Sequence, residues 1–203
     1  MSRGRPGHAT PHPPSGGAGP LPLRGREDEL ALIGRDLEAL GGGHGGVILI
    51  EGAPGSGKTS VLEEIERRAA GTGIRTFRAA CDAAAGAMPL SPLLDALLHG
   101  RPPLLDARVL REIAAMPDAR FWMLQELQER LERAALAAPL VVAVDDLHWA
   151  DEATLLALRT LPERLATHAL LWVLARRPGG AALTAGRLQE SGARSLVLGA
   201  LER

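Results

Sequence analysis

The sequence predicts an α/β protein, a three-layer sandwich in which a parallel sheet of about five strands lies between two layers of helices. Short apolar runs alternate along the chain with segments whose apolar residues recur at helical spacing. A glycine-rich loop separates one of the earliest apolar runs from the helix that follows it. The chain has 203 residues and 46% hydrophobic content, which is enough for one buried core. Because strands that alternate with helices are joined by crossovers, the sheet is expected to be parallel and covered on both faces.

The first 22 residues do not predict a folded structure. They are rich in Gly, Pro, Ser and His and hold few large apolar side chains, so they cannot repay the entropy of ordering. We therefore expect a disordered tail over residues 1–22 and one domain over residues 23–203. Up to position 26 the chain carries four arginines and no acid. A solvated tail is the simpler interpretation, and a contact with nucleic acid or acidic lipid is the alternative.

Composition excludes several classes of protein. The net charge of −1 does not give the overall positive charge that is typical of DNA-binding domains. Cys81 is the single cysteine, so the chain cannot form an internal disulfide. No apolar signal segment is visible at the start, and the longest apolar stretch, residues 134–144, is interrupted by Pro139 and is too short to span a bilayer. No cluster of Cys and His has metal-ligand spacing. We expect a cytoplasmic protein that does not enter a membrane.

The elements follow from hydrophobic periodicity. From Arg26 the apolar residues predict a helix, which the glycine-rich run at residues 41–46 ends. We expect strands at residues 47–51, 74–80, 140–144, 168–175 and 195–198, and helices at residues 58–70, 93–98, 107–115, 119–138 and 152–161, the last capped by Asp151. The helix at 119–138 has acidic and basic residues four apart, which we interpret as the solvated face of a helix packed on the sheet.

Residues 52–59 satisfy the pattern G-x-x-x-x-G-K-[ST] between an apolar strand and a helix. In such a P-loop the glycines let backbone N–H groups surround the β-phosphate, the lysine contacts the β- and γ-phosphates, and the hydroxyl ligates Mg²⁺. Lys58 is the only lysine of the chain, so its place in this pattern is difficult to ascribe to chance. The motif predicts bound ATP with Mg²⁺, a catalytic role for Lys58 and a nucleotide-binding set made of Gly52, Ala53, Pro54, Gly55, Ser56, Gly57, Lys58, Thr59 and Ser60.

The predicted strand at residues 140–144 ends in two carboxylates, Asp145 and Asp146. At the carboxyl end of a strand neighbouring the P-loop strand, Asp145 would hold Mg²⁺ through water, together with Thr59. Asp146 would reach the γ-phosphate and orient an attacking water. The alternative is a loop in which both acids are solvated.

The residues after this strand carry a resemblance. Residues 145–155 resemble the signature of the ATPase domain in LuxR-type large ATP-binding regulators, members of the STAND group of P-loop NTPases. Residues 23–30 are similar to the first motif of that family, and residues 81–94 and 172–178 look like the segments at its second and fourth strands. The resemblance covers the chain from Leu23 to its end.

The resemblance implies further site residues. Arg26, in the first motif, would lie near the adenine. Arg177, at the end of the fourth strand, would be the sensor of the γ-phosphate, while Arg176 would face away. Two positions depart from the family pattern: Arg24 replaces an apolar residue, and Pro162 falls where the family helix continues.

The resemblance implies an ATP-binding switch domain that responds to ATP and ADP, hydrolyses ATP slowly and associates with itself. Such proteins continue into a winged-helix lid, a repeat region and a helix-turn-helix, none of which is in this sequence. DNA contact is therefore expected only through a domain outside the chain. The alternatives are an AAA+ ATPase of the origin-recognition or helicase-loader type, a small-molecule or nucleotide kinase, for which arginines are too sparse at residues 101–111, and a non-hydrolysing ATP-binding fragment.

Two residues of the signature have open roles. His148 is either structural or a group that polarises a water or senses the γ-phosphate, and Trp149 is most simply a packing residue.

Overall fold

The structure, a computed structural model, describes residues 25–82, 88–179 and 192–199. The predicted tail at residues 1–22 lies outside the described residues. The elements in chain order are α1 (Glu27–Gly41), β1 (Gly46–Gly52), α2 (Lys58–Gly71), β2 (Arg75–Ala80), α3 (Ser91–His99), α4 (Ala107–Ala114), α5 (Ala119–Ala137), β3 (Leu140–Asp145), the short 3₁₀ helix η1 (Leu147–Trp149), α6 (Glu152–Arg164), β4 (Leu170–Arg176) and β5 (Arg194–Leu198).

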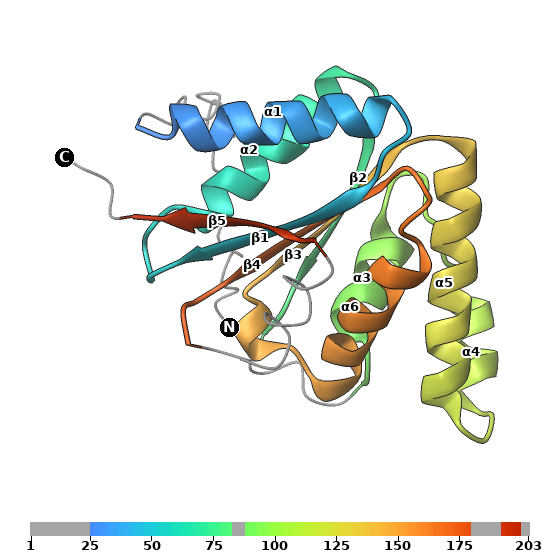
Figure 1. Cartoon of the computed structure of the whole chain (residues 1–203). Coiled ribbons are helices and arrows are strands. Elements are labelled where there is room, and N and C mark those ends of the chain that lie inside the picture. The colour runs from blue at the N-terminus through green and yellow to red at the C-terminus, as the bar shows by residue number, and fades with distance from the viewer. Residues whose placement is uncertain (1–24, 83–87, 180–191, 200–203) are drawn as a thin grey trace, which may run out of the picture.

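The strands form one parallel sheet in the order β2-β3-β4-β1-β5. Helices α1 and α2 cover one face and α3 to α6 cover the other, which confirms the predicted three-layer sandwich (Figure 1). Each layer of helices closes its own apolar cluster against the sheet. Alternate residues of β3 show why: Val142 and Val144 belong to the cluster under α3–α6, and Val141 and Ala143 belong to the cluster under α1 and α2.

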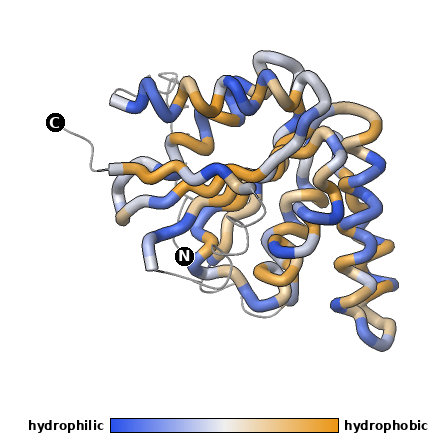
Figure 2. The backbone as a smooth tube through the Cα atoms, viewed as in Figure 1, coloured by the Kyte–Doolittle hydropathy of each residue, from blue (hydrophilic) through white to orange (hydrophobic). Residues whose placement is uncertain are grey.

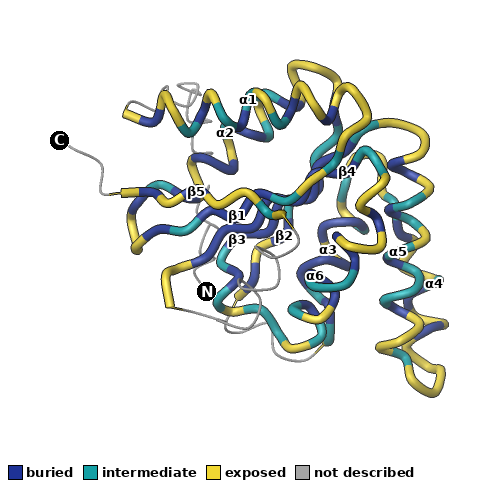
Figure 3. The backbone as a smooth tube through the Cα atoms, in the orientation of Figure 1, coloured by how far each residue is buried: buried dark blue, intermediate teal, exposed yellow. Residues whose placement is uncertain are grey.

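Burial follows the position of each strand in the sheet. Every residue of β3 and β4 is buried, because both strands have neighbours on both sides and helices on both faces. The edge strands β2 and β5 alternate buried and more accessible residues. Figure 2 shows the apolar colour gathered on the central strands, and Figure 3 shows exposure on the outer sides of the helices.

One expectation about the sheet is wrong. The strand that ends in the two acids, β3, does not neighbour the P-loop strand β1, because β4 lies between them. After β1, helix α2 crosses the sheet to β2 at the far edge, and the chain then returns through β3 to β4. Helix α2 contacts β1, β4, β3 and β2, so its first turn can still approach the end of β3.

Local chemistry sets the helix ends. Asp151 caps α6 as predicted, since its carboxylate accepts hydrogen bonds from the backbone N–H groups of Ala153 and Thr154, both at 3.0 Å. Helix α6 continues past the predicted end and includes Pro162, which lies in its last turn and is buried. The 3₁₀ turn η1 was not predicted, because three residues give no periodic pattern.

The long helix α5 packs as predicted. Its buried residues, Met123, Leu127, Leu131, Ala134 and Ala135, join the cluster under the sheet. The solvated side holds the two expected ion pairs, with N–O distances of 2.7 Å for Arg130–Glu126 and 3.0 Å for Arg133–Glu129. Across the described ranges, no helix has both the length and the apolar character to cross a membrane.

Candidate nucleotide-binding site

The loop between β1 and α2 turns at glycines. Gly55 has φ +77° and Gly57 has φ +87°, a backbone region that other residues occupy at a cost. The N–H of Ser56 donates to the carbonyl of Ala53 at 3.1 Å and closes the turn. Ala53, Pro54 and Gly55 are exposed. Helix α2 begins at Lys58 with no side-chain cap among the described residues, so its first N–H groups are available to an anion.

Gly52 lies where backbone and side chains approach closely. A Cβ at this position would lie 2.2 Å from Ser56 Oγ and 3.2 Å from the Cβ of Leu198 on β5. The Ser56 hydroxyl is itself buried and has no hydrogen-bond partner within the described ranges. A side chain at position 52 would therefore require the Ser56 hydroxyl to rotate and its neighbours to move slightly, so packing favours glycine as the first residue of the motif.

Lys58 is buried and folded back on its own loop. Its Nζ donates to the carbonyls of Gly52 at 2.9 Å and Ala53 at 3.0 Å. An ammonium has three donors, and these bonds use two of them. The side chain is thus held at the mouth of the loop, where a phosphate would meet the remaining donor.

Thr59 and Asp145 meet across the site. The Thr59 hydroxyl donates to Asp145 Oδ2 at 2.9 Å, although 86 residues separate the two in sequence. Asp145 Oδ1 accepts the backbone N–H of Asp146 at 2.9 Å, and Asp145 is buried. The structure therefore brings the predicted hydroxyl and the predicted carboxylate into direct contact, even though β3 is not the strand beside β1.

These two side chains fit a magnesium ion. Mg²⁺ prefers hard oxygen ligands and is held in nucleotide sites by one or two protein groups together with phosphates and water. A hydroxyl and a carboxylate oxygen 2.9 Å apart beside Lys58 supply that donor set. No group of three or more His, Cys, Asp or Glu side chains suited to a metal is present within the described ranges. The part of the chain that the structure describes thus offers no complete protein cage for a metal.

Asp146 and His148 follow at the end of β3. Asp146 has φ +50°, and its side chain is 45% exposed, in contrast to the buried Asp145. Its Oδ1 lies 3.7 Å from His148 Nδ1, too far for a hydrogen bond. Both ring nitrogens of His148 are buried, and in the part of the chain that is described they have no hydrogen-bond partner. His148, whose role the sequence left open, thus lies beside Asp146, the acid that is predicted to orient the attacking water.

Burial lowers the pKa of His148, and the positive charges of Arg177 and Lys58 lower it further, against the opposing effect of Asp146 and Asp145. These effects favour the neutral form of the ring. Trp149, expected as a packing residue, is 49% exposed and lies with its ring centroid 5.0 Å from that of His148.

Arg26 is a buried connector. It precedes α1, and its guanidinium donates to the carbonyl of Ser56 at 3.2 Å, to the carbonyl of Gly199 and to Glu29 Oε1 at 3.0 Å. It thereby joins the start of α1, the P-loop and the end of β5. An adenine contact of Arg26 stays a prediction, and what the structure displays is a contact with the loop backbone.

The two arginines at the end of β4 differ in environment. Arg176 is buried, and its Nε donates to Glu51 Oε1 of β1 at 2.7 Å. It alternates with Ala175, whose side chain packs under α1 and α2, so Arg176 belongs to the opposite face of the sheet. Arg177 is exposed just beyond the strand, and its charge acts on His148. Because β4 lies between β1 and β3, Arg177 follows a strand end between the P-loop and the two acids.

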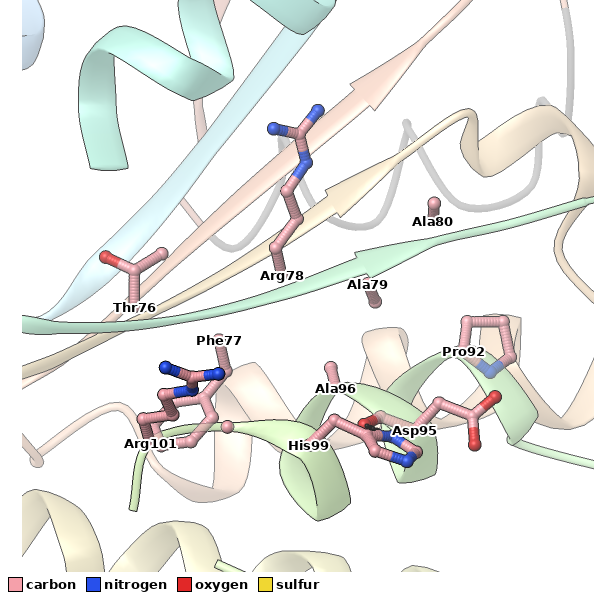
Figure 4. Close-up of a pocket in the computed structure, with 11 residues that line it drawn as sticks. Thr76, Phe77, Arg78, Ala79, Ala80, Pro92, Asp95, Ala96, His99 and Arg101 are labelled. Atoms are coloured by element: carbon pink, nitrogen blue, oxygen red, sulfur yellow. Dashed lines mark hydrogen bonds between the residues drawn. The ribbon is translucent and has the colours of Figure 1, made fainter. Parts of the chain in front are cut away.

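Sequence reasoning missed Arg78. This residue of β2 donates from Nη2 to Asp145 Oδ2 at 3.1 Å and from Nη1 to Glu66 Oε1 of α2 at 3.3 Å. A cavity of about 460 Å³ lies between β2 and α3. Figure 4 shows that Phe77 points toward α3, while the side chain of Arg78 leaves the strand on the other side. A charged residue inside a predicted strand was the available signal, but its partner is 67 residues away.

Comparison with known proteins gives a family. Residues 22–173 match the model of the AAA ATPase domain. A curated relative, an uncharacterized protein of Rhizobium meliloti (strain 1021), is 29% identical over 191 residues, which cover 77% of this chain and 19% of the relative. The chain thus spans about a fifth of the length of that relative.

Solved structures share the fold. The CDC6P structure from Pyrobaculum aerophilum has a TM-score of 0.64 at 16% identity, over 88% of this chain and 46% of that chain. The Aeropyrum pernix ORC2 protein, solved as ADPNP and ADP complexes, has a TM-score of 0.57 at 20% identity, over 87% and 48%. AMPPCP-bound DnaA from Aquifex aeolicus has a TM-score of 0.54 at 16% identity, over 88% and 48%. The chain spans about half the length of each of these three proteins.

Proposed function

Because the chain belongs to the AAA ATPase domain family, we propose that it binds ATP with Mg²⁺ at the carboxyl end of its sheet and hydrolyses it slowly, as a nucleotide-dependent switch. The observation that carries the proposal is the contact between Thr59 and Asp145 at 2.9 Å, beside the buried ammonium of Lys58. A phosphate-binding loop alone fits many proteins. A loop hydroxyl joined to the acid of a distant strand favours a metal-nucleotide site.

Each side chain has a part in binding. The N terminus of α2 and the backbone from Gly52 to Ser60 would surround the phosphates, and Lys58 would direct its remaining donor toward them. Thr59 and Asp145 would hold Mg²⁺, which when bound neutralises charge on the β- and γ-phosphates. Solved structures of this fold with ADPNP, ADP and AMPPCP support an adenine nucleotide as the ligand.

Hydrolysis needs a group that orients water. Asp146 is the accessible acid of the pair, with its side chain 45% exposed, whereas Asp145 is occupied by three donors. Asp146 would accept a hydrogen bond from the attacking water and hold it in line with the γ-phosphate. Arg177 would pair with the terminal oxygens and distinguish ATP from ADP.

For the larger protein we propose a LuxR-type transcriptional regulator of the STAND group. The run from His148 to Asp151 after the paired acids supports this assignment. The alternative is an initiator ATPase of the origin-recognition type, which the fold shared with ORC2, CDC6P and DnaA supports about as well. In both cases the chain works in the cytoplasm and associates with other copies through the ATPase domain. DNA is contacted by a domain outside this sequence.

Titration with a fluorescent ATP analogue, in the presence of Mg²⁺, tests the proposal. Lys58→Ala removes a charged donor and should weaken binding by about ten- to a hundredfold. The matched control is Arg67→Ala on the same helix, which removes a cation that is 60% exposed and should leave affinity unchanged. Equal affinity in Lys58→Ala and the unchanged protein would refute nucleotide binding at this loop.

A second variant separates binding from hydrolysis. Asp146→Asn keeps the shape of the side chain and loses the charge, so analogue binding should persist while phosphate release slows by about a hundredfold or more. If Asp146→Asn hydrolysed ATP at the rate of the unchanged protein, Asp146 would not orient the attacking water. His148, which lies beside Asp146, would then be the next candidate for this role.

A further inference from the structure

Asp145 has a cationic partner that the proposed mechanism does not use. We propose that Arg78 is a positioning residue that occupies Asp145 in the nucleotide-free site and competes with Mg²⁺ for this carboxylate. This inference rests on the proposed function, since it concerns the same metal site. It assigns to β2, an edge strand without P-loop residues, a part in setting the magnesium requirement.

The Asp145 carboxylate accepts hydrogen bonds from three donors. Oδ2 accepts from Thr59 Oγ1 at 2.9 Å and from Arg78 Nη2 at 3.1 Å, and Oδ1 accepts from the N–H of Asp146 at 2.9 Å. The side chain of Asp145 is 6% exposed, so protein donors rather than bulk water satisfy most of it. The oxygen that faces Thr59, where Mg²⁺ is expected, is the one that Arg78 also holds.

The sheet makes this contact possible. Ala80 of β2 lies opposite Asp145 in the parallel register, and Arg78 precedes it by two residues on the same face. A long side chain at that position reaches along the face under α2 toward the strand ends. The opposite face holds Phe77, which points toward α3 (Figure 4).

Two acids of α2 hold the other side of the guanidinium. Arg78 Nη1 lies 3.3 Å from Glu66 Oε1 and 4.0 Å from Glu63 Oε1. Burial raises the pKa of Glu66, and the neighbouring Glu63 and Asp145 raise it further, against the lowering effect of Arg78. Arg78 is thus shared between the metal-site acid and helix α2. When Asp145 receives another cation, the guanidinium can keep its bonds to α2.

Competition follows from charge. A divalent cation placed against Asp145 would lie within a few ångströms of the guanidinium, and like charges at that separation repel even when partly solvated. Removal of Arg78 leaves Thr59 and the Asp146 N–H to orient the carboxylate, so the metal site keeps its shape and loses a repelling charge. The magnesium requirement should therefore fall when Arg78 is absent.

The test is a magnesium titration of analogue binding to the full chain, with EDTA as the zero point. In Arg78→Ala the Mg²⁺ concentration for half-maximal binding should fall by about three- to tenfold. Arg75→Ala is the matched control, because Arg75 is on the same strand and stacks over Phe77 at 5.6 Å, and it should show no shift. Glu66→Gln frees Arg78 for Asp145 and should raise the midpoint. Thermal melting establishes that each variant is folded.

The outcomes are separable. An unchanged or higher midpoint in folded Arg78→Ala, with normal binding in the unchanged protein, would overturn the competition and leave the proposed function intact. Absence of analogue binding in the unchanged protein would overturn both. If Arg78→Ala does not fold, the direction of the shift in Glu66→Gln decides, since a fall or no change there contradicts competition.

Discussion

Replacement of Arg26 by alanine is expected to destabilise the domain and, through the loop, to weaken nucleotide binding. The guanidinium is buried and joins three elements by hydrogen bonds to the Ser56 carbonyl, the Gly199 carbonyl and the Glu29 carboxylate. Hydrogen bonds from a charged donor contribute about 1.5–3 kcal/mol each. Released side-chain entropy and water at the freed acceptors offset part of this, so the net loss should be about 2–4 kcal/mol.

Urea and thermal unfolding measure this loss. For a domain of this size about 2–4 °C of Tm corresponds to 1 kcal/mol, so a loss of about 2–4 kcal/mol should lower the Tm by about 4–16 °C. The control is Arg35→Ala, an exposed residue of the same helix, which should stay within about 0.5 kcal/mol of the unchanged protein. Arg26→Lys retains one charge but cannot span three acceptors, and an intermediate stability is expected.

Binding distinguishes the two roles assigned to Arg26. If it supports the loop through Ser56, affinity for inorganic triphosphate and for ATP should fall together, because the loop contacts phosphates. If it contacts adenine alone, only ATP should be affected, and stability should match that of Arg35→Ala. That second pattern would refute the connector role.

Two further predictions concern charge. In a competition titration, Arg177→Ala should show a preference for ATP over ADP that is about tenfold weaker than in the unchanged protein. Arg176→Ala should keep this preference but be less stable, because the substitution removes the hydrogen bond from Arg176 to Glu51. An equal loss of preference in both variants would contradict the sensor role. The hydrogen bond from Arg67 and the charges of Arg67 and Arg68 lower the pKa of Glu64 from 4.5 to about 2. The ionised Glu64 carboxylate therefore stabilises the fold above pH 4.5, and this stabilisation is lost as the pH falls toward 2. Between these pH values the stability of Glu64→Gln should depend less steeply on pH than that of the unchanged protein. Identical acid transitions would show that the contacts of Glu64 with Arg67 and Arg68 contribute nothing to stability.

The sequence was sufficient for whatever depends on local pattern. The five strands and the main helices lie within a few residues of their predicted positions, because periodicity and capping residues act over one or two turns. The capping role of Asp151 is an example, since the two N–H groups that it caps lie only two and three residues along the chain. The P-loop was equally accessible, as its glycines and Lys58 are contiguous.

Contacts between elements that are distant in the sequence could not be predicted from local patterns. The order of strands depends on where crossovers go, and nothing in the sequence around Asp145 indicated that β4 would lie between β3 and β1. Arg78 appeared as one charged residue within a strand, and only the parallel register reveals that it shares a face with Asp145. Arg26 reaches Ser56 and Gly199, which are 30 and 173 residues away.

The strand order that sequence reasoning missed also explains how the proposed sensor would work. With β4 between the P-loop strand and the acidic strand, the end of β4 faces the gap that a γ-phosphate would enter. The hydrogen bond from Arg176 to Glu51 joins the ends of β4 and β1 on one face of the sheet, and it fixes the backbone from which Arg177 extends. The charges of Arg177 and Lys58 both lower the pKa of His148, so each cation lies within electrostatic reach of that ring. A terminal phosphate near these groups would meet one cation from the start of α2 and one from beyond the end of β4, whereas a diphosphate would leave Arg177 without its anion.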